Sequence, residues 1–115
     1  MRIKEEDILQ QKCVMWFNHN YRHNHHRMLF HVDNNSWNAT VGAIKKGLGV
    51  VQGPSDLILI VECDVIFLEA KTPSGTQLPE QVDFMNKVKE RGHKYIIFRT
   101  FEEFQSIIKK YLPNG

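Results

Sequence analysis

The sequence of 115 residues is long enough for one domain with one hydrophobic core. Hydrophobic residues make up 42% of it and charged residues 24%, which is ordinary for globular proteins and argues against wholesale disorder. The formal net charge of +2 neither demands nor opposes a polyanionic partner. Two isolated cysteines, Cys13 and Cys63, predict neither disulfides nor a zinc site. Without a signal core or a membrane-spanning run, residues 1–115 are expected to form one soluble, intracellular (cytoplasmic) domain.

The first expected element is a helix over residues 4–18. Its apolar residues recur on one side at helical spacing, and acidic residues in its first turn suit the positive end of the helix dipole. The expected apolar stripe consists of Ile8, Leu9, Cys13, Trp16 and Phe17.

A polar segment rich in asparagine and histidine comes next, at residues 18–27. Its four histidines raise the hypothesis of a metal cluster, but their spacing matches no rigid chelate, and such runs usually form loops. We therefore expect a solvated loop from His19 to His26, with local nucleic-acid contact as an alternative.

Short elements are expected in the next part of the chain. Residues 28–32 favour a strand, and the polar residues 33–36 favour a turn whose Ser36 caps the next helix. That short helix, over residues 37–47, ends at Gly47, and glycine and proline in residues 49–54 predict a bend.

Two apolar runs, at residues 57–61 and 65–70, predict a β-hairpin. With Glu62 and Cys63 at its tip, Val61 pairs with Asp64. Because both runs are nearly continuously apolar, we expect both faces of the hairpin to be covered, so that it lies centrally in its sheet.

The remaining chain predicts a helix over residues 79–91, a strand over 94–99 and a last helix that Thr100 caps. The helix between strands 65–70 and 94–99 predicts a right-handed crossover and a parallel pair. The expected fold class is therefore α/β, a mixed central sheet flanked by helices.

Three charged residues meet at the open end of the predicted hairpin. Counting outward from the tip places Asp56 opposite Glu69, and Lys71 leaves the same face as Glu69. An isolated Glu-x-Lys pair is most often a surface salt bridge, but here the second carboxylate falls opposite it. Two carboxylates so close are costly unless neutralised, and a divalent cation is the natural candidate.

Such a constellation suits metal-assisted hydrolysis of a phosphodiester. Asp56 and Glu69 would hold Mg²⁺ or Mn²⁺, and Lys71 would position or activate the attacking water. Gln81, in the first turn of the helix that begins near Pro79, is expected to point back over the carboxylates, or else to be an ordinary exposed residue.

These motifs together resemble the VRR-NUC (virus-type replication-repair nuclease) domain of the PD-(D/E)XK nuclease superfamily. The segment from Gly53 to Asp56, the Glu69-Ala-Lys71 strand and Gln81 carry the resemblance, and the helix that contains Glu6 is similar to the opening helix of that family. It implies a restriction-endonuclease-like αβββαβ core.

The resemblance also implies roles for individual residues. Asp56 and Glu69, with the main-chain carbonyl of Ala70, would bind the metal, and Glu6 would lie in its outer shell. Lys71 would be the catalytic lysine, oriented by Gln81. One departure is Ser55, which stands where many members have proline, so we expect a slight shift of geometry.

The activity implied is a Mg²⁺- or Mn²⁺-dependent DNA endonuclease of phage origin, without organic cofactor, that cuts branched DNA such as Holliday junctions as a homodimer. Candidate phosphate contacts are Lys45, Lys46, Lys87, Lys89 and Lys94. No base-reading motif is evident, so structure-selective binding is expected. The alternatives are a catalytically silent nuclease-fold module that binds DNA or protein, and an RNA-processing nuclease.

Overall fold

The computed structural model describes residues 4–25, 27–32, 43–44, 46–49 and 55–113. The helices and strands, in chain order, are α1 (Glu5–His25), β1 (Leu29–His31), β2 (Leu57–Val61), β3 (Asp64–Ala70), α3 (Pro79–Glu90), β4 (Lys94–Phe98) and α4 (Phe101–Tyr111). The predicted α/β class is confirmed. Within these described ranges, no helix is both long enough and apolar enough to cross a bilayer.

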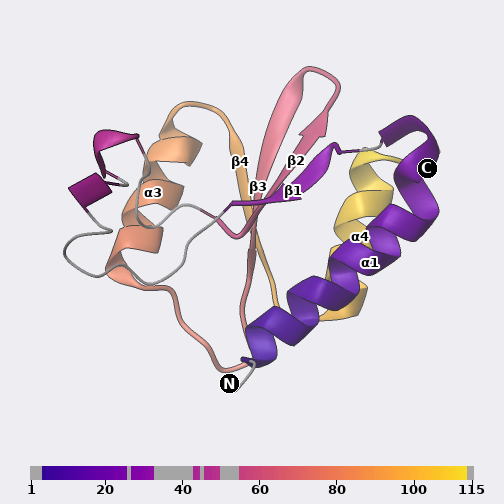
Figure 1. Ribbon diagram of the computed structural model, residues 1–115, viewed down its shortest axis with the longest axis horizontal. Coiled ribbons are helices and arrows are strands. Elements are labelled where there is room, and N and C mark those ends of the chain that lie inside the picture. The colour runs from indigo at the N-terminus through magenta and orange to yellow at the C-terminus, as the bar shows by residue number, and fades with distance from the viewer. Residues whose placement is uncertain (1–3, 26, 33–42, 45, 50–54, 114–115) are drawn as a thin grey trace.

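The four strands form one sheet in the order β1-β2-β3-β4. Both β1 and β3 run antiparallel to β2, whereas β4 runs parallel to β3. The predicted mixed sheet, its central hairpin and its parallel pair are therefore confirmed, and α3 makes the crossover (Figure 1).

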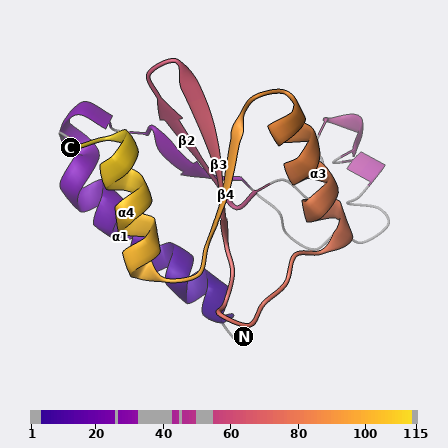
Figure 2. The same ribbon diagram turned by 180° about the vertical axis from the view of Figure 1, so that it is seen from behind.

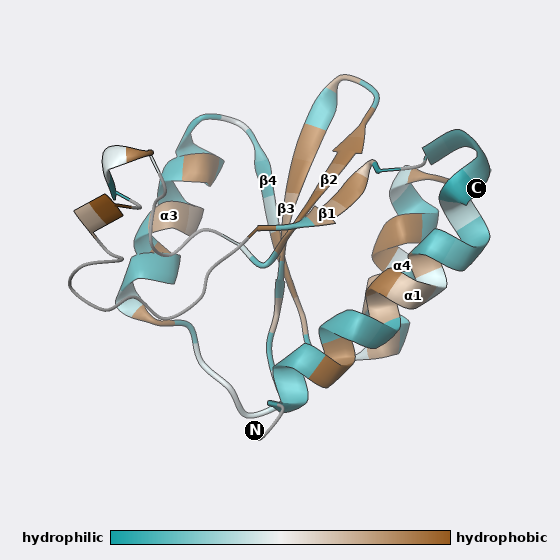
Figure 3. Ribbon diagram, in the orientation of Figure 1, coloured by the Kyte–Doolittle hydropathy of each residue, from teal (hydrophilic) through white to brown (hydrophobic). Residues whose placement is uncertain are grey.

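The two faces of the sheet are covered differently. Helices α1 and α4 lie together on one face and α3 lies on the other (Figures 1 and 2). Trp16 connects α1 to α4, because its ring lies edge-on to the rings of Phe101 and Phe104 in α4, with centroids 6.0 Å and 6.2 Å away. Hydrophobic residues are concentrated in the central strands and α4 (Figure 3). The core between the sheet and α1 and α4 includes Phe17, Leu57, Leu59, Ile66, Leu68, Phe98, Phe104 and Ile108.

Helix α1 is longer than predicted, because residues 18–25 continue it and do not form a loop. Tyr21 explains the difference: it is buried, and its ring stacks on that of Phe17 at 5.2 Å. Packing of this one aromatic residue thus outweighs the loop preference of its polar neighbours. Ile8, expected in the apolar stripe, is 55% exposed.

Several expected features fall in parts of the chain that are not described. These are the turn at residues 33–36, most of the helix over 37–47 and the bend at 50–54. The C-terminal end of that helix, residues 46–49, is described. There Gly49, and not Gly47, has a positive φ, of 90°. The amide of Gly49 donates to the carbonyl of Lys46 at 3.1 Å, so the helical turn closes two residues later than expected.

Candidate active site at the open end of the hairpin

The hairpin has the predicted register. Val61 pairs with Asp64, and at the other end Leu57 pairs with Leu68. One further step places Asp56 opposite Glu69, and the amide of Ala70 donates a hydrogen bond to Asp56 Oδ2 at 2.8 Å. That bond fixes the Asp56 carboxylate against the end of β3.

Glu69 projects from β3 on the face covered by α3 and is fully buried. Its Oε1 accepts hydrogen bonds from the hydroxyl of Tyr95 and, at 3.2 Å, from Gln77 Nε2. Its Oε2 has no hydrogen-bond partner among the described residues, and the nearest cation, Lys71 Nζ, lies 3.7 Å away. The two oxygens of one carboxylate therefore have different surroundings.

Lys71 is held by the first turn of α3. Its Nζ donates to Gln81 Oε1 at 3.0 Å, and the same oxygen accepts from the amide of Leu78 at 2.8 Å. Lys71 is 6% exposed and Gln81 is 8% exposed. Gln81 is therefore buried and bonded to Lys71, and not an ordinary exposed residue, while its role at the carboxylates stays a prediction.

The electrostatics of this end follow from burial. Burial raises the pKa of Asp56 from its ordinary value of 3.8 to about 6, although the hydrogen bond from the amide of Ala70 lowers it. The negative charges of Glu69 and Glu6 raise this pKa further, and Lys71 opposes them. The carboxylates of Asp56, Glu69 and Glu6 would therefore be destabilised by the loss of the Lys71 charge and stabilised by an added positive charge.

The first turn of α1 also reaches the site. A pocket of about 680 Å³ beside Lys71 is lined in part by Glu5 and Glu6 of that turn and by Thr72. Within the described ranges, no three acidic, histidine or cysteine side chains come close enough to hold an ion together. The two carboxylates at this end of the hairpin are Asp56 and Glu69, and Glu6 is close enough for its charge to raise the pKa of Asp56.

The segment that leads into β2 is fixed from two sides. Ser55, the residue where the resemblance departs, is fully buried, and its hydroxyl donates to the carbonyl of Leu57 at 3.0 Å. The carbonyl of Asp56 accepts from the amide of Val32 at 2.9 Å and lies 2.9 Å from His31 Nδ1. The serine therefore has its own structural role at the start of the strand.

Two of the candidate phosphate contacts, Lys87 and Lys94, are paired with carboxylates. Lys87 pairs with Asp83 at 3.0 Å in the exposed part of α3, and Lys94 pairs with Asp64 at 2.7 Å near the hairpin turn. Lys46 and Lys89 are exposed, and Lys45 is outside the described residues. Lys94 lies at the opposite end of β3 from Glu69, because β4 pairs it with Ile66.

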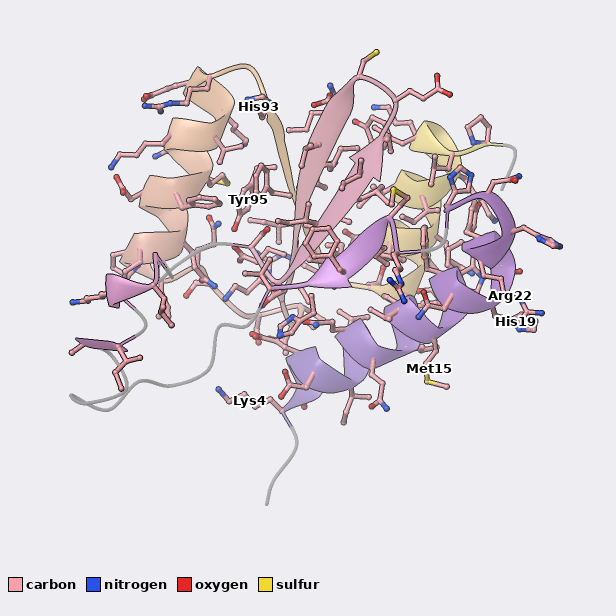
Figure 4. The ribbon with its side chains drawn as sticks, turned by 45° about the horizontal axis from the view of Figure 1, so that its top comes forward. Lys4, Met15, His19, Arg22, His93 and Tyr95 are labelled. Atoms are coloured by element: carbon pink, nitrogen blue, oxygen red, sulfur yellow. The ribbon has the colours of Figure 1, made fainter. Side chains whose placement is uncertain are left out.

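Two polar residues of the site, Tyr95 and Gln77, were missed. Figure 4 shows Tyr95 on β4, between the sheet and α3. Tyr95 pairs with Phe67, two residues before Glu69 and on the same face. Burial and the carboxylate of Glu69 raise the pKa of Tyr95, so its hydroxyl stays a donor. The parallel pair was predictable, but its register was not, and only the register brings Tyr95 to Glu69.

A third residue that was missed is Arg99, after β4. Its Nη1 donates to the carbonyl of Thr72 at 2.8 Å and to that of Gly75 at 2.7 Å. Arg99 thereby holds the loop that comes after Lys71 and leads to α3. A basic residue at the end of a strand gives no sequence signal for such a bond.

No protein-family model and no curated protein sequence matches the chain. Among solved structures, one described as a "VRR_NUC domain protein" is similar, with a TM-score of 0.78 over 100% of this chain and 93% of that chain. The two sequences are 18% identical, so the likeness concerns the fold alone. The chain thus shares the fold of this VRR_NUC domain protein.

Proposed function

We propose that the chain is a metal-dependent nuclease of the PD-(D/E)XK type that hydrolyses phosphodiester bonds in DNA. One observation carries the proposal. The buried Oε2 of Glu69 has no hydrogen-bond donor in the described part of the chain, and a second, half-buried carboxylate, Asp56, lies beside it. A buried carboxylate oxygen without a partner is costly, and a hard cation would satisfy it.

The residues present fit such a cation. Asp56 and Glu69 supply carboxylate oxygens, the carbonyl of Ala70 supplies a neutral one, and Glu6 adds negative charge nearby. Mg²⁺ or Mn²⁺ bound there would polarise a phosphoryl oxygen and make an attacking water more acidic. The raised pKa of Asp56 adds support, because a divalent cation would favour its ionised form.

Lys71 has the position of a catalytic amine in this proposal. Gln81 fixes its Nζ at 3.0 Å, and the nearly complete burial of the side chain limits the positions of that group. An ammonium held beside the carboxylates would orient the attacking water or stabilise negative charge that develops on the phosphate. Gln81 acts through Lys71 and is a positioning residue.

The substrate is proposed to be branched DNA, cut by a homodimer. A chain of 13.5 kDa offers a small footprint, and a two-fold axis would present two sites to two strands. Lys46 and Lys89, both exposed, would contact phosphates without reading sequence.

The test is cleavage of a synthetic four-way junction, a linear duplex and a single-stranded RNA in Mg²⁺ or Mn²⁺. The expected result is cleavage of the junction that a chelator abolishes. Lys71→Ala should lower the rate by about 10²- to 10⁴-fold. Asp64→Asn, which changes a carboxylate at the far end of the hairpin, is the control and should cut like the wild type. Equal cutting by Lys71→Ala would show that the role given to Lys71 is wrong.

Calorimetric titration with Mn²⁺ separates this proposal from a silent binding module. A nuclease should take up the ion, and Glu69→Gln should weaken that uptake. DNA binding that persists without any uptake of Mn²⁺ by the wild type would instead support the silent module.

A further inference from the structure

The surroundings of Glu69 differ between its two oxygens in a way that has a chemical consequence. Oε1 accepts from Tyr95 and Gln77, whereas Oε2 accepts from no described residue. Lys71 does not change this, because its Nζ is 3.7 Å from Oε2 and donates to Gln81. The donors thus occupy one oxygen and leave the other free.

A carboxylate is symmetric, so nothing in Glu69 itself selects which oxygen is free. Its last torsion is broad and two-fold, and a rotation of half a turn would exchange the two oxygens. Two donors directed at the same point fix the plane of the carboxylate and hold the remaining oxygen in place. Outer partners of this kind orient ligands in metal sites generally.

Tyr95 is itself rigidly placed. Its ring stacks on that of Phe67, with centroids 6.4 Å apart, and meets the ring of Phe84 from α3 at 6.2 Å. Phe67 and Phe84 are in edge-to-face contact at 5.4 Å. The rings of Phe67 from β3 and Phe84 from α3 therefore hold the ring of Tyr95 and fix the direction of its hydroxyl.

We propose that Tyr95 and Gln77 are positioning residues that bind Oε1 of Glu69 and so present Oε2 to the divalent cation. The proposal rests on the metal-dependent function proposed above. It assigns to β4 and to the loop before α3 a part in metal affinity, without contact to substrate.

The experiment measures Mn²⁺ binding to the full chain without DNA, by calorimetry and by the paramagnetic resonance signal of free Mn²⁺. Tyr95→Phe removes the donor and keeps the ring. It should weaken Mn²⁺ binding by about 10- to 100-fold. Tyr111→Phe, which removes a hydroxyl at the other end of the molecule, is the matched control and should bind Mn²⁺ like the wild type.

Cleavage provides a second readout that a merely structural role would not move. The Mn²⁺ concentration for half-maximal cleavage by Tyr95→Phe should rise by the same factor, with kcat at saturating Mn²⁺ largely restored. Gln77→Leu should produce a smaller shift in the same direction, and it serves as the second variant if Tyr95→Phe does not fold.

The outcomes distinguish this proposal from the function on which it rests. Wild type that binds Mn²⁺ and variants that bind it equally well would overturn the positioning role and leave the nuclease proposal standing. Wild type that takes up no Mn²⁺ would overturn both. A lower melting temperature with unchanged Mn²⁺ affinity would make Tyr95 a packing residue only.

Discussion

The two ends of the β2–β3 hairpin carry the same chemical groups in opposite environments. At the turn, Asp64 and Lys94 form an exposed ion pair with a distance of 2.7 Å. At the open end, Glu69 and Lys71 are buried with 3.7 Å between their charged atoms. The closer pair is the exposed one, and each of its members satisfies the other.

The difference shows that burial, not the presence of charges, separates a candidate site from an ordinary salt bridge. At the turn, the hydrogen bond from Lys94 holds the pKa of Asp64 below its usual value. At the open end, burial raises the pKa of Asp56 to about 6. In the exposed pair, each charge is stabilised by the other charge and by water. In the buried cluster, one carboxylate oxygen of Glu69 has no such partner among the described residues.

The largest contrast is expected in activity. Glu69→Gln keeps the size of the side chain but removes the charge at Oε2, so cleavage should fall to the background of the assay. Asp64→Asn makes the equivalent change at the turn and should leave the rate unchanged. Rates measured on one junction substrate at saturating Mg²⁺ compare the two variants, and a similar loss in both would abolish the distinction between the ends.

The pH dependence of stability should have opposite signs at the two ends. Because the pKa of Asp56 is raised in the folded state, the unfolded chain releases this proton first as pH rises. Stability therefore falls between about pH 4 and about pH 6, by up to about 3 kcal/mol for this group. Asp56→Asn should remove this loss and be more stable than the wild type at pH 8, when both are unfolded by urea without metal.

Asp64 provides the control for that measurement. Its pKa is lowered in the folded state, so its contribution is present above its unfolded pKa and is lost on acidification. The free energy of unfolding of Asp64→Asn should therefore differ from that of the wild type at neutral pH and approach it at low pH. That of Asp56→Asn should also approach the wild-type value at low pH. A gain of stability at pH 8 in both variants would contradict the opposite signs.

Removal of the acceptor in α3 should have an intermediate effect. Gln81→Leu leaves the buried Nζ of Lys71 and the amide of Leu78 without their shared acceptor. Unfolding in urea should show a destabilisation of about 1–3 kcal/mol, and cleavage should fall by less than in Lys71→Ala. Gln105→Leu, in the helix on the other face, is a control with the same side-chain change.

The smallest effect is expected at the turn itself. Asp64→Asn should lower the melting temperature only slightly, and added salt should shrink the difference further, because the pair is exposed. Melting curves at low and high salt measure this. If Asp64→Asn lowered the melting temperature as much as Gln81→Leu does, the ion pair at the turn would contribute as much to stability as the buried contacts at the open end.

Patterns of apolar residues were enough to predict the sheet, its central hairpin and its parallel pair. The site was predictable where it depends on one strand pair, as for Asp56 and Glu69, because the tip of the hairpin sets their register. Tyr95 depends on the register between β3 and β4, which a whole helix separates, and the sequence contains no rule for it. The length of α1 was missed because the burial of Tyr21 in the core is a tertiary effect that its polar neighbours in the sequence do not reveal.

The candidate catalytic centre draws its parts from α1, the start of β2, β3, α3 and β4, so only a fragment that spans most of the chain contains it. Tyr95 reaches Glu69 only after α3 has crossed the sheet and β4 has paired with β3. A nascent chain that has just released β3 from the ribosome would carry the acidic strand but not the hydroxyl that orients it. Pairing of β4 with β3, which joins residues far apart in the sequence, would then be the step that completes the candidate site.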